Sequence, residues 1–324
     1  MSEQVLNDCF EATLRPLLTL KPLFLLRDGI LNPYERLLLK YDRRQLCIAS
    51  QRSQGELRRL CELHGLGHFD EIPEAKPLKP AELLSRIGER IAEDLKLLPT
   101  QYLHPDNVQL EGSVEQLYVH AQAKISRHAV IDTTEGPVVI DSAARIGALS
   151  YVKGPAYIGK LTQLDQCRFS NSIAGENCRL GGEIADSIIG NFSNKHHDGF
   201  LGHSLVGDWV NLGALTTTSD LKNNYGEIRL RYAGTTYPTG TIKFGAIIGD
   251  YVKTAIGTLL GTGSVVGVGA NLFGESYWSG DIAPFTWGRE GIYDRDLFIR
   301  DAGRMMQRRG RGVSASLEAI LRLI

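Results

Sequence analysis

Between residues 117 and 275, large apolar residues recur at intervals of six. The phase is kept by five successive positions over 140–164 and by five more over 248–272. A small residue often follows four places later, and a glycine often follows directly. The repeating positions are Val119, Ile125, Ile131, Ile140, Ile146, Val152, Ile158, Leu164, Val206, Leu212, Ile248, Thr254, Leu260, Val266 and Leu272. Such a fixed period is typical of repeat architectures.

A period of six matches neither an α-helix nor simple strand alternation. It fits a parallel β-helix whose coil is a triangular prism with one short strand on each face. The large residue then points inward, the small one fits near a corner, and glycine permits the sharp turn. A β-sandwich would instead show turn signals every 8–12 residues. We therefore predict a mainly β chain built on a parallel β-helix, with an irregular stretch around 166–200.

The chain changes character near residue 110, which predicts three regions. Residues 1–105 are rich in Leu, Arg, Lys and Glu, and 55–67 and 81–98 have helical spacing. Residues 106–280 form the β-helix, and the segment 217–247 interrupts the repeat, so we expect it to project as a functional loop. Residues 281–324 form a helical extension that could cap the open end of the prism.

Composition narrows the classes of function. The formal net charge is −1 and the isoelectric point is about 6.7, so no bulk charge points to nucleic acid or an anionic membrane. The 5 cysteines are scattered and contain no CxxC pair, which favours reduced thiols over disulfides or a zinc knuckle. No secretory signal or membrane span is visible. We expect a soluble cytoplasmic protein.

Two long motifs carry a resemblance to a known family. The first is GGEIADSIIGNFSNKHHDGFLGHSLVGDWVNLGALTTTSDLKNNYG, followed by FGAIIGDYVKTAIGTLLGTGSVVGVGANLFG. The second is LRPLLTLKPLFLLRDGIL at the N-terminus, where Lys21 replaces an expected arginine. Together they resemble a GlmU-like family, in which a sugar-1-phosphate nucleotidyltransferase is fused to an amino-sugar N-acetyltransferase domain. The resemblance implies a left-handed parallel β-helix, with a small α or α/β region before it and a helix after it.

Only about 75 residues separate the N-terminal motif from the repeats, and no glycine-rich phosphate loop is present. We therefore expect nucleotidyltransferase activity to be absent. Residues 1–105 would be a degenerate remnant that serves packing or oligomerisation.

The resemblance assigns roles to residues near the histidines. Acetyl transfer to an amine needs a general base with a pKa near neutrality, which suits histidine. His197 lies fifteen residues before Leu212, as the family's base does, and Asn211 matches a sugar-contacting asparagine. Phe200 stands where the family has tyrosine, and Asp220 where it has an asparagine near the acyl group. Leu215 replaces an expected glycine.

Further residues are expected to bind the phosphates of the substrates. Candidates for a sugar phosphate are Lys195, Lys222, Arg168, Arg179 and Arg229. The resemblance places acetyl-CoA in a groove between adjacent prisms, which implies a homotrimer. Its binding residues would be Ala255, Gly257, Thr258 and Thr262, with Arg308 and Arg309 on the CoA phosphates.

Two other readings stay open. Some hexapeptide β-helices bind zinc through histidines of two subunits, and His196, His197 and His203 could be imagined in that way. The resemblance favours the acetyltransferase branch, so we expect no metal in the reaction. Alternatively, the β-helix binds a sugar nucleotide or scaffolds a partner without catalysis.

Overall fold

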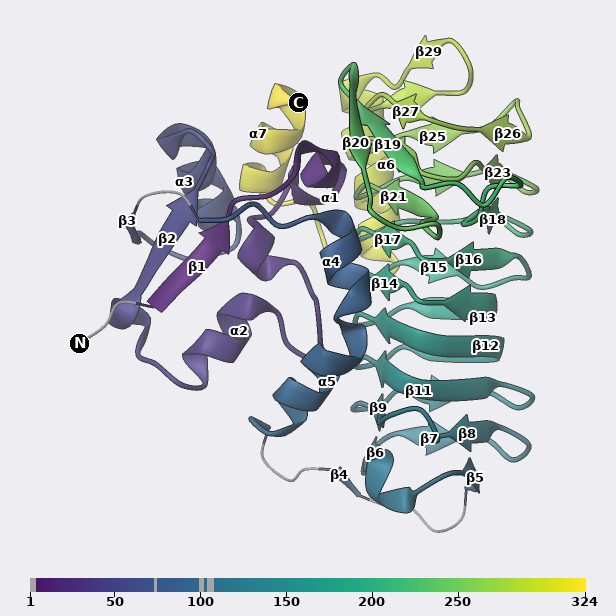
Figure 1. Cartoon of the computed structure of the whole chain (residues 1–324). Helices are drawn as coiled ribbons and strands as arrows, with labels where there is room; N and C mark the ends of the chain where they lie inside the picture. Colours follow the sequence, from purple (N-terminus) through teal and green to yellow (C-terminus); the bar gives the residue numbers. More distant parts are fainter. Residues whose placement is uncertain (1–3, 73–74, 99–101, 104–107) are drawn as a thin grey trace.

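The computed structural model describes residues 4–72, 75–98, 102–103 and 108–324. A tall solenoid of parallel strands stands beside a smaller N-terminal α/β unit, and the C-terminal helices lie between them (Figure 1). The predicted parallel β-helix, the small N-terminal α/β region and the C-terminal helix are confirmed.

The solenoid has three faces, which we call A, B and C. Face A is formed by β6 (Leu117–His120), β9 (Val138–Ile140), the ends of β11 (Tyr151–Ile158) and β12 (Gln163–Ala174), β14 (Ile188–Ile189), β17 (Leu205–Val206), β21 (Ala246–Ile248), β24 (Ser264–Val266) and β27 (Asp281–Ile282).

Face B is formed by β7 (Lys124–Ile125), β10 (Arg145–Ile146), the starts of β12 and β13 (Arg179–Ala185), β15 (Asn194–Lys195), β22 (Lys253–Thr254), β25 (Asn271–Leu272) and β28 (Thr286–Trp287). Face C is formed by β5 (Gln109–Glu111), β8 (Val130–Asp132), the start of β11, the middle of β12, the end of β13, β16 (Phe200–Gly202), β18 (Thr217–Thr218), β23 (Leu259–Leu260) and β26 (Tyr277–Trp278).

The large residues of the repeat fill the prism as predicted. All but one of the repeating positions are buried, and Ile125, in an early coil, is partly buried. The irregular stretch has a simple cause. Partners on face B step from 145 to 163, which is 18 residues, but then from 163 to 179, 194 and 211, which are steps of 16, 15 and 17. Shorter corners therefore break the six-residue spacing while the strands stay paired.

Face A also carries apolar side chains on its outside. These outward residues are Val139, Tyr157, Ile173, Ile188, Leu205, Ile247 and Val265, and all are buried. The N-terminal unit covers them with α1 (Arg15–Leu18), α4 (Pro80–Ser85) and α5 (Ile87–Leu95). Burying one aliphatic side chain of this size stabilises by about 1.5–3 kcal/mol. The covered face A joins the two parts into one body.

The rest of the N-terminal unit is a parallel sheet of β1 (Gln4–Asp8), β2 (Leu46–Ser50) and β3 (Asp70–Glu71), flanked by α2 (Pro33–Leu38) and α3 (Gln54–Leu63). Short 3₁₀ turns connect these elements at Ala12–Leu14, Leu23–Leu25 and Arg43–Gln45, and one more precedes β6 at Val114–Gln116. β4 (Tyr102–Leu103) pairs antiparallel with β6. The expected loss of nucleotidyltransferase activity stays a prediction.

The structure differs from the sequence prediction in where the β-helix ends and in where the C-terminal helix packs. The ladders continue past residue 280, because β27 pairs with β24 and β28 pairs with β25, while β29 (Gly291–Ile292) turns back on β28. The helix α6 (Arg295–Gln307) packs along the side of the prism, where Phe298 and Met306 are buried against Tyr251, rather than across its end. α7 (Ala315–Leu323) then contacts α3.

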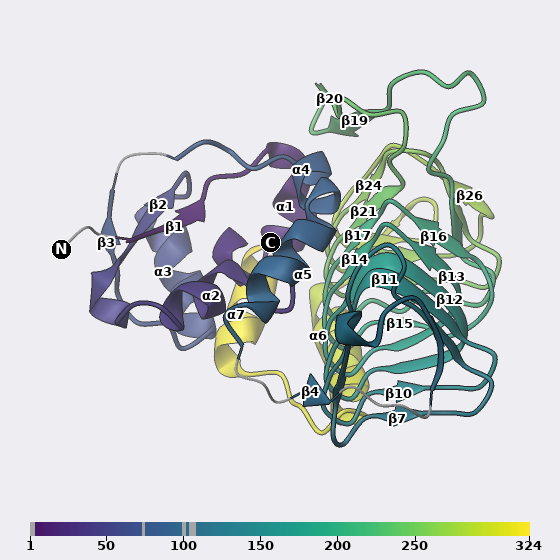
Figure 2. The same cartoon turned by 60° about the horizontal axis from the view of Figure 1, so that its bottom comes forward.

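The interrupting segment does project, as a hairpin of β19 (Arg229–Tyr232) and β20 (Thr235–Pro238) (Figure 2). Its base is not free. Ile228 and Leu230 are buried in the cluster that covers face A, and Leu221 pairs with Lys243 at the neck. The segment is therefore anchored to the N-terminal unit.

One buried ion cluster fixes the N-terminal unit on the solenoid. The Lys21 ammonium lies 2.5 Å from Asp208 Oδ2 and 3.1 Å from Asp250 Oδ1, and Lys21 is 5% exposed. Close approach requires a glycine beside it, because a Cβ on Gly249 would lie 2.9 Å from the Pro16 carbonyl oxygen. Burial opposes the charged lysine, but attraction from both carboxylates outweighs it and raises the pKa of Lys21. Burial also raises the pKa of Asp250 to about 7.

We predict that Lys21→Met destabilises the protein by about 3–5 kcal/mol at pH 8, because it leaves buried carboxylates without a cation. The raised pKa of Asp250 means that its ionisation opposes folding, at a cost that grows as the pH rises from the ordinary range of an aspartate through about 7. At pH 5 Asp250 is mostly protonated in the folded protein, so the removal of the lysine charge should destabilise the protein less than at pH 8. Urea unfolding at both pH values measures it, with the exposed Lys40→Met as control. Equal losses at pH 5 and pH 8 would contradict this account.

Candidate active site

His197 lies at an open corner of the prism. It follows β15 on face B and precedes β16 on face C, in the turn that we call corner BC. The turn needs a glycine at 199, where φ is 127° and a Cβ would lie 2.2 Å from the Thr216 carbonyl oxygen. The His197 side chain is exposed and lines a shallow cavity of about 340 Å³ with Asp198, Ala214 and Leu215. In the part of the chain that the structure describes, no side chain is hydrogen-bonded to its imidazole.

His196 is held differently from its neighbour. Its Nε2 lies 2.8 Å from Asp165 Oδ2, and its ring is 5.4 Å from the ring of His197. His196 lines the His197 cavity and also a second cavity on face B. His196 therefore lies between the two cavities and forms part of the wall of each.

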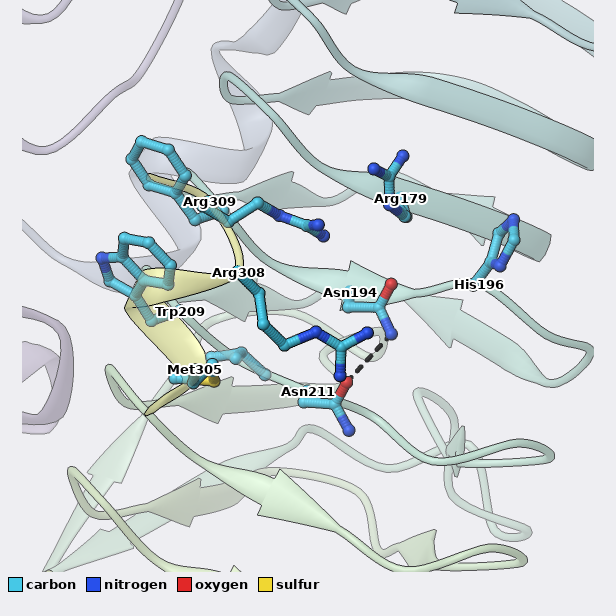
Figure 3. A pocket seen from close by; sticks show the side chains of 10 residues that line it. Arg179, Asn194, His196, Trp209, Asn211, Met305, Arg308 and Arg309 are labelled. Carbon is cyan, nitrogen blue, oxygen red and sulfur yellow. Dashed lines mark hydrogen bonds between the residues drawn. The ribbon is translucent and has the colours of Figure 1, made fainter. Parts of the chain in front are cut away.

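That second cavity is rich in arginine. Its volume is about 270 Å³, and its lining includes Arg179 from β13 and both Arg308 and Arg309 from the end of α6 (Figure 3). Asn194 Nδ2 donates to Asn211 Oδ1 over 2.9 Å in the same wall. The structure thus brings Asn211, Arg308 and Arg309 together, and adds Asn194 and Arg179.

Asp220 lies at another corner. We call the turn from face C to face A corner CA, and His203 there binds Asp220 through Nδ1 over 2.7 Å. The Nε2 of the same ring is 3.6 Å from Asp186 Oδ2. A Cβ on Gly202 would meet both the Phe200 ring, at 2.3 Å, and the Asp220 carboxylate, at 2.7 Å. Phe200 and Asp220 are therefore neighbours, but Asp220 is paired with His203 and not with His197.

The two lysines expected to bind phosphate donate hydrogen bonds to backbone carbonyl oxygens instead. Lys195 points into the prism, is 3% exposed and donates to the carbonyl oxygens of Gly181 and His197. Burial lowers the pKa of Lys195 to about 8. Lys222 donates to the Glu227 carbonyl oxygen within the projecting segment. This geometry favours a structural role for Lys195 under the His197 corner.

The expected CoA-binding residues divide between corners. Ala255, Gly257 and Thr258 continue corner BC beyond Ala214, since Gly257 N donates to the Ala214 carbonyl oxygen. Thr258 is buried and its hydroxyl donates to Ala255. Thr262 lies at corner CA, where its hydroxyl bonds Ser219.

The histidines do not form a metal site within one chain. His196 and His197 occupy corner BC, whereas His203 occupies corner CA. Among residues 4–72, 75–98, 102–103 and 108–324, no group of three His, Cys, Asp or Glu side chains could hold a metal ion. No helix in the same residues is long and apolar enough to cross a membrane.

Sequence reasoning missed two partnerships of the site. Asn194 on Asn211 links neighbouring coils, whereas Asp165 on His196 spans two coil steps across Gly181. The first could have been found from the coil step, because residues 17 apart lie one above the other in this stretch. Arg168, a candidate for phosphate, is 3.4 Å from Glu183 instead.

Two solved structures that match this chain share little sequence with it. One is UDP-N-acetylglucosamine O-acyltransferase (LpxA) from Moraxella catarrhalis, at 12% identity over 67% of this chain and 91% of that one, with a TM-score of 0.18. Another is the acetyltransferase domain of PglB from Neisseria gonorrhoeae in complex with acetyl coenzyme A, at 13% identity over 76% and 84%, with a TM-score of 0.16. At TM-scores this low, neither structure bears on the site of this chain.

The curated relatives are more informative, although no protein-family model matches the sequence. A GlmU bifunctional protein of Methanococcus vannielii is 32% identical over 120 residues, which is 35% of this chain and 28% of the relative. A GlmU of Cyanothece is 24% identical over 234 residues, or 70% and 42%. A bifunctional sugar-1-phosphate nucleotidylyltransferase/acetyltransferase of Sulfurisphaera tokodaii is 30% identical over 91 residues, or 28% and 23%. The chain is therefore a relative of the GlmU-like proteins that its motifs resemble, and these matches span between 23% and 42% of their length.

Proposed function

We propose that this protein is an acyltransferase that moves an acetyl group from acetyl-CoA to the amine of an amino-sugar phosphate such as glucosamine-1-phosphate, with His197 as general base. The carrying observation is the free imidazole at an open corner. His196 is bonded to Asp165, and His203 lies between Asp220 and Asp186. Of these three histidines, His197 is the one that has no described side-chain partner and can accept a proton from a ligand.

The chemistry needs one proton transfer at this corner. The neutral amine attacks the thioester carbonyl carbon, and His197 accepts a proton from the nitrogen as the C–N bond forms. The C–S bond then breaks, and the proton passes from His197 to the departing thiolate, which leaves as CoA. No acyl-enzyme and no metal enter these steps.

The acyl donor would lie along corner BC. Ala255 and Gly257 continue the column of the His197 turn, and Thr258 shapes that turn through its bond to Ala255. The donor would bond backbone groups of these corners. Thr262 has its place at the other corner and is left out of the proposed donor site.

The acceptor would contact both sides of the corner. Asn211 offers its amide on face B, and Phe200 offers an aromatic ring on face C. Asp220 would act through His203, by holding that imidazole at the far edge of face C.

A shallow corner gives one wall of a site, so we propose that a homotrimer supplies the second. Corner BC carries exposed apolar side chains, with Leu149 71%, Leu215 54% and Ile256 78% exposed. Leu215 and Ile256 lie on adjacent coils of this corner, and exposed apolar surface there is typical of contact sites. The same column passes His197, so the partner copy would close the cavity over the base.

One observation favours a second candidate function. Asp220 stands where the resemblance predicts an asparagine, and its carboxylate is bonded to His203. It therefore does not orient the His197 imidazole. A non-catalytic β-helix that binds a sugar nucleotide or scaffolds a partner would keep this arrangement. CoA binding separates the two, because the second candidate does not require it.

We predict that His197→Ala lowers acetyl transfer by about 100-fold or more, because general bases contribute that much. Thiol release from acetyl-CoA with a panel of amino sugars and their phosphates measures it. His128→Asn, an exposed histidine on an earlier coil, is the control. No turnover by the wild type together with no CoA binding by calorimetry would refute the enzyme. A loss in His203→Asn but not in His197→Ala would move the base to corner CA.

We predict that Ile256→Asp dissociates the oligomer, because a carboxylate in an apolar contact loses its hydration. Sedimentation velocity measures the assembly, and Leu39→Asp, which changes an exposed leucine of the N-terminal unit, should leave it intact. A wild-type protein that sediments as a monomer at micromolar concentration would contradict the trimer.

A further inference from the structure

Three guanidinium groups meet in the cavity on face B without an acid among its lining residues. Arg308 and Arg309 extend from the end of α6, one toward the Asn194–Asn211 pair and the other toward Arg179 (Figure 3). Within the described chain, no ion pair or hydrogen bond engages these three guanidinium groups. His196, in the same lining, is bonded through Nε2 to the Asp165 carboxylate.

Other arginines of α6 are satisfied. Arg300 and Arg304 are both 3.0 Å from Asp301, and Arg295 stacks 3.4 Å over the Phe285 ring. The lack of partners is thus confined to the cavity and is not a general property of this helix.

The arginines are held in place by a packed helix and a strand. Phe298 and Met306 anchor α6 on Tyr251 at the prism side. Arg308 is the C-cap of this helix and Arg309 follows it, and their backbone N–H groups donate to the Met305 and Met306 carbonyl oxygens. Arg179 begins β13, whose partners are fixed on both sides of the sheet. The convergence is therefore a feature of the fold and not of a loose tail.

The three guanidinium groups line one cavity and repel one another, and a guanidinium cannot release its proton to relieve the repulsion. Burial lowers the pKa of Arg309, and repulsion from Arg179 and Arg308 lowers it further. The helix dipole favours cations at the end of α6, but its effect is small and falls off within the last turn. A bound anion would remove the cost for all three.

The lining residues and the volume of the cavity indicate which kind of anion it can bind. Guanidinium forks match phosphate oxygens with paired hydrogen bonds, and three of them suit a group with several oxygens. About 270 Å³ has room for a diphosphate with part of the molecule that carries it. A net charge of −1 does not favour nucleic acid.

We propose that Arg179, Arg308 and Arg309 bind the phosphate or diphosphate group of a small molecule, and that this ligand clamps α6 onto face B. The identity of the ligand rests on the proposed function, since His196 joins this cavity to that of His197. The group belongs either to the acceptor, as a sugar phosphate or sugar nucleotide, or to CoA.

Inorganic pyrophosphate tests the site without any turnover. Calorimetry on the full chain should show binding that weakens with salt, because the contacts are charged. Arg308→Ala and Arg179→Ala should each weaken it by about ten-fold or more. Arg304→Ala, on the same helix but paired with Asp301, should change it by less than about two-fold. Amide exchange in α6 should slow when pyrophosphate is present.

Two pairs of nucleotides then identify the source of the phosphate. Uridine diphosphate against uridine tests the acceptor, and CoA against dephospho-CoA tests the donor, each with wild type and Arg308→Ala. No binding of pyrophosphate by the wild type overturns the site. So does binding as tight as that of the wild type by both Arg179→Ala and Arg308→Ala, provided that each variant keeps the wild-type circular dichroism. Absent acetyl transfer with pyrophosphate binding intact overturns the proposed enzyme and leaves this site standing.

Discussion

The apolar stack inside the prism determines where every functional group of this molecule can lie. Residues such as Ile146, Leu164 and Leu180 are fully buried one above the other, and parallel pairing keeps successive coils in register. Because the stack fixes how far the chain advances in each coil, it fixes the three columns of corners. His197, Leu215 and Gly257 share one column for this reason, while His203 and Asp220 share another.

Face A gives the molecule its second constraint. A solenoid with polar outer faces could stand alone, but this one has an apolar row on the outside of one face. The N-terminal unit buries that row, and the Lys21 cluster aligns it with two coils. The motif that resembles a nucleotidyltransferase contributes Leu17, Leu18 and Lys21 to this contact. Face C, corner BC and the part of face B that α6 leaves open stay accessible, and the candidate site lies on them.

Local pattern was enough to predict the β-helix, because each large inward residue occupies the same position in its hexad. His197 and His203 are six residues apart, which corresponds to one face of the prism, and they lie at successive corners. The outer apolar row could have been recognised as well, since face A strands such as Val138–Ile140 and Ala246–Ile248 are apolar at every position. That signal predicts a strand buried on both sides.

The partners of the site were harder to predict, because they depend on coil length. Asp220 lies 17 residues after His203 and pairs with it, and a count in hexads of six does not reveal this. Lys195 was expected to bind a phosphate, but it occupies an inward position and donates to the carbonyl oxygen of His197. The arginine cavity joins residue 179 to residues 308 and 309, and only the packing of α6 on the prism brings them together.

The central claim is that His197, at corner BC, is where acyl transfer occurs. A crystal structure of the protein with CoA and an amino-sugar phosphate tests it most directly. The account predicts the acceptor nitrogen within hydrogen-bond distance of the His197 imidazole, with the CoA sulfur beside it in a groove closed by a second copy of the chain. An acceptor nitrogen bound at the His203–Asp220 pair, or both ligands bound away from corner BC, would contradict it.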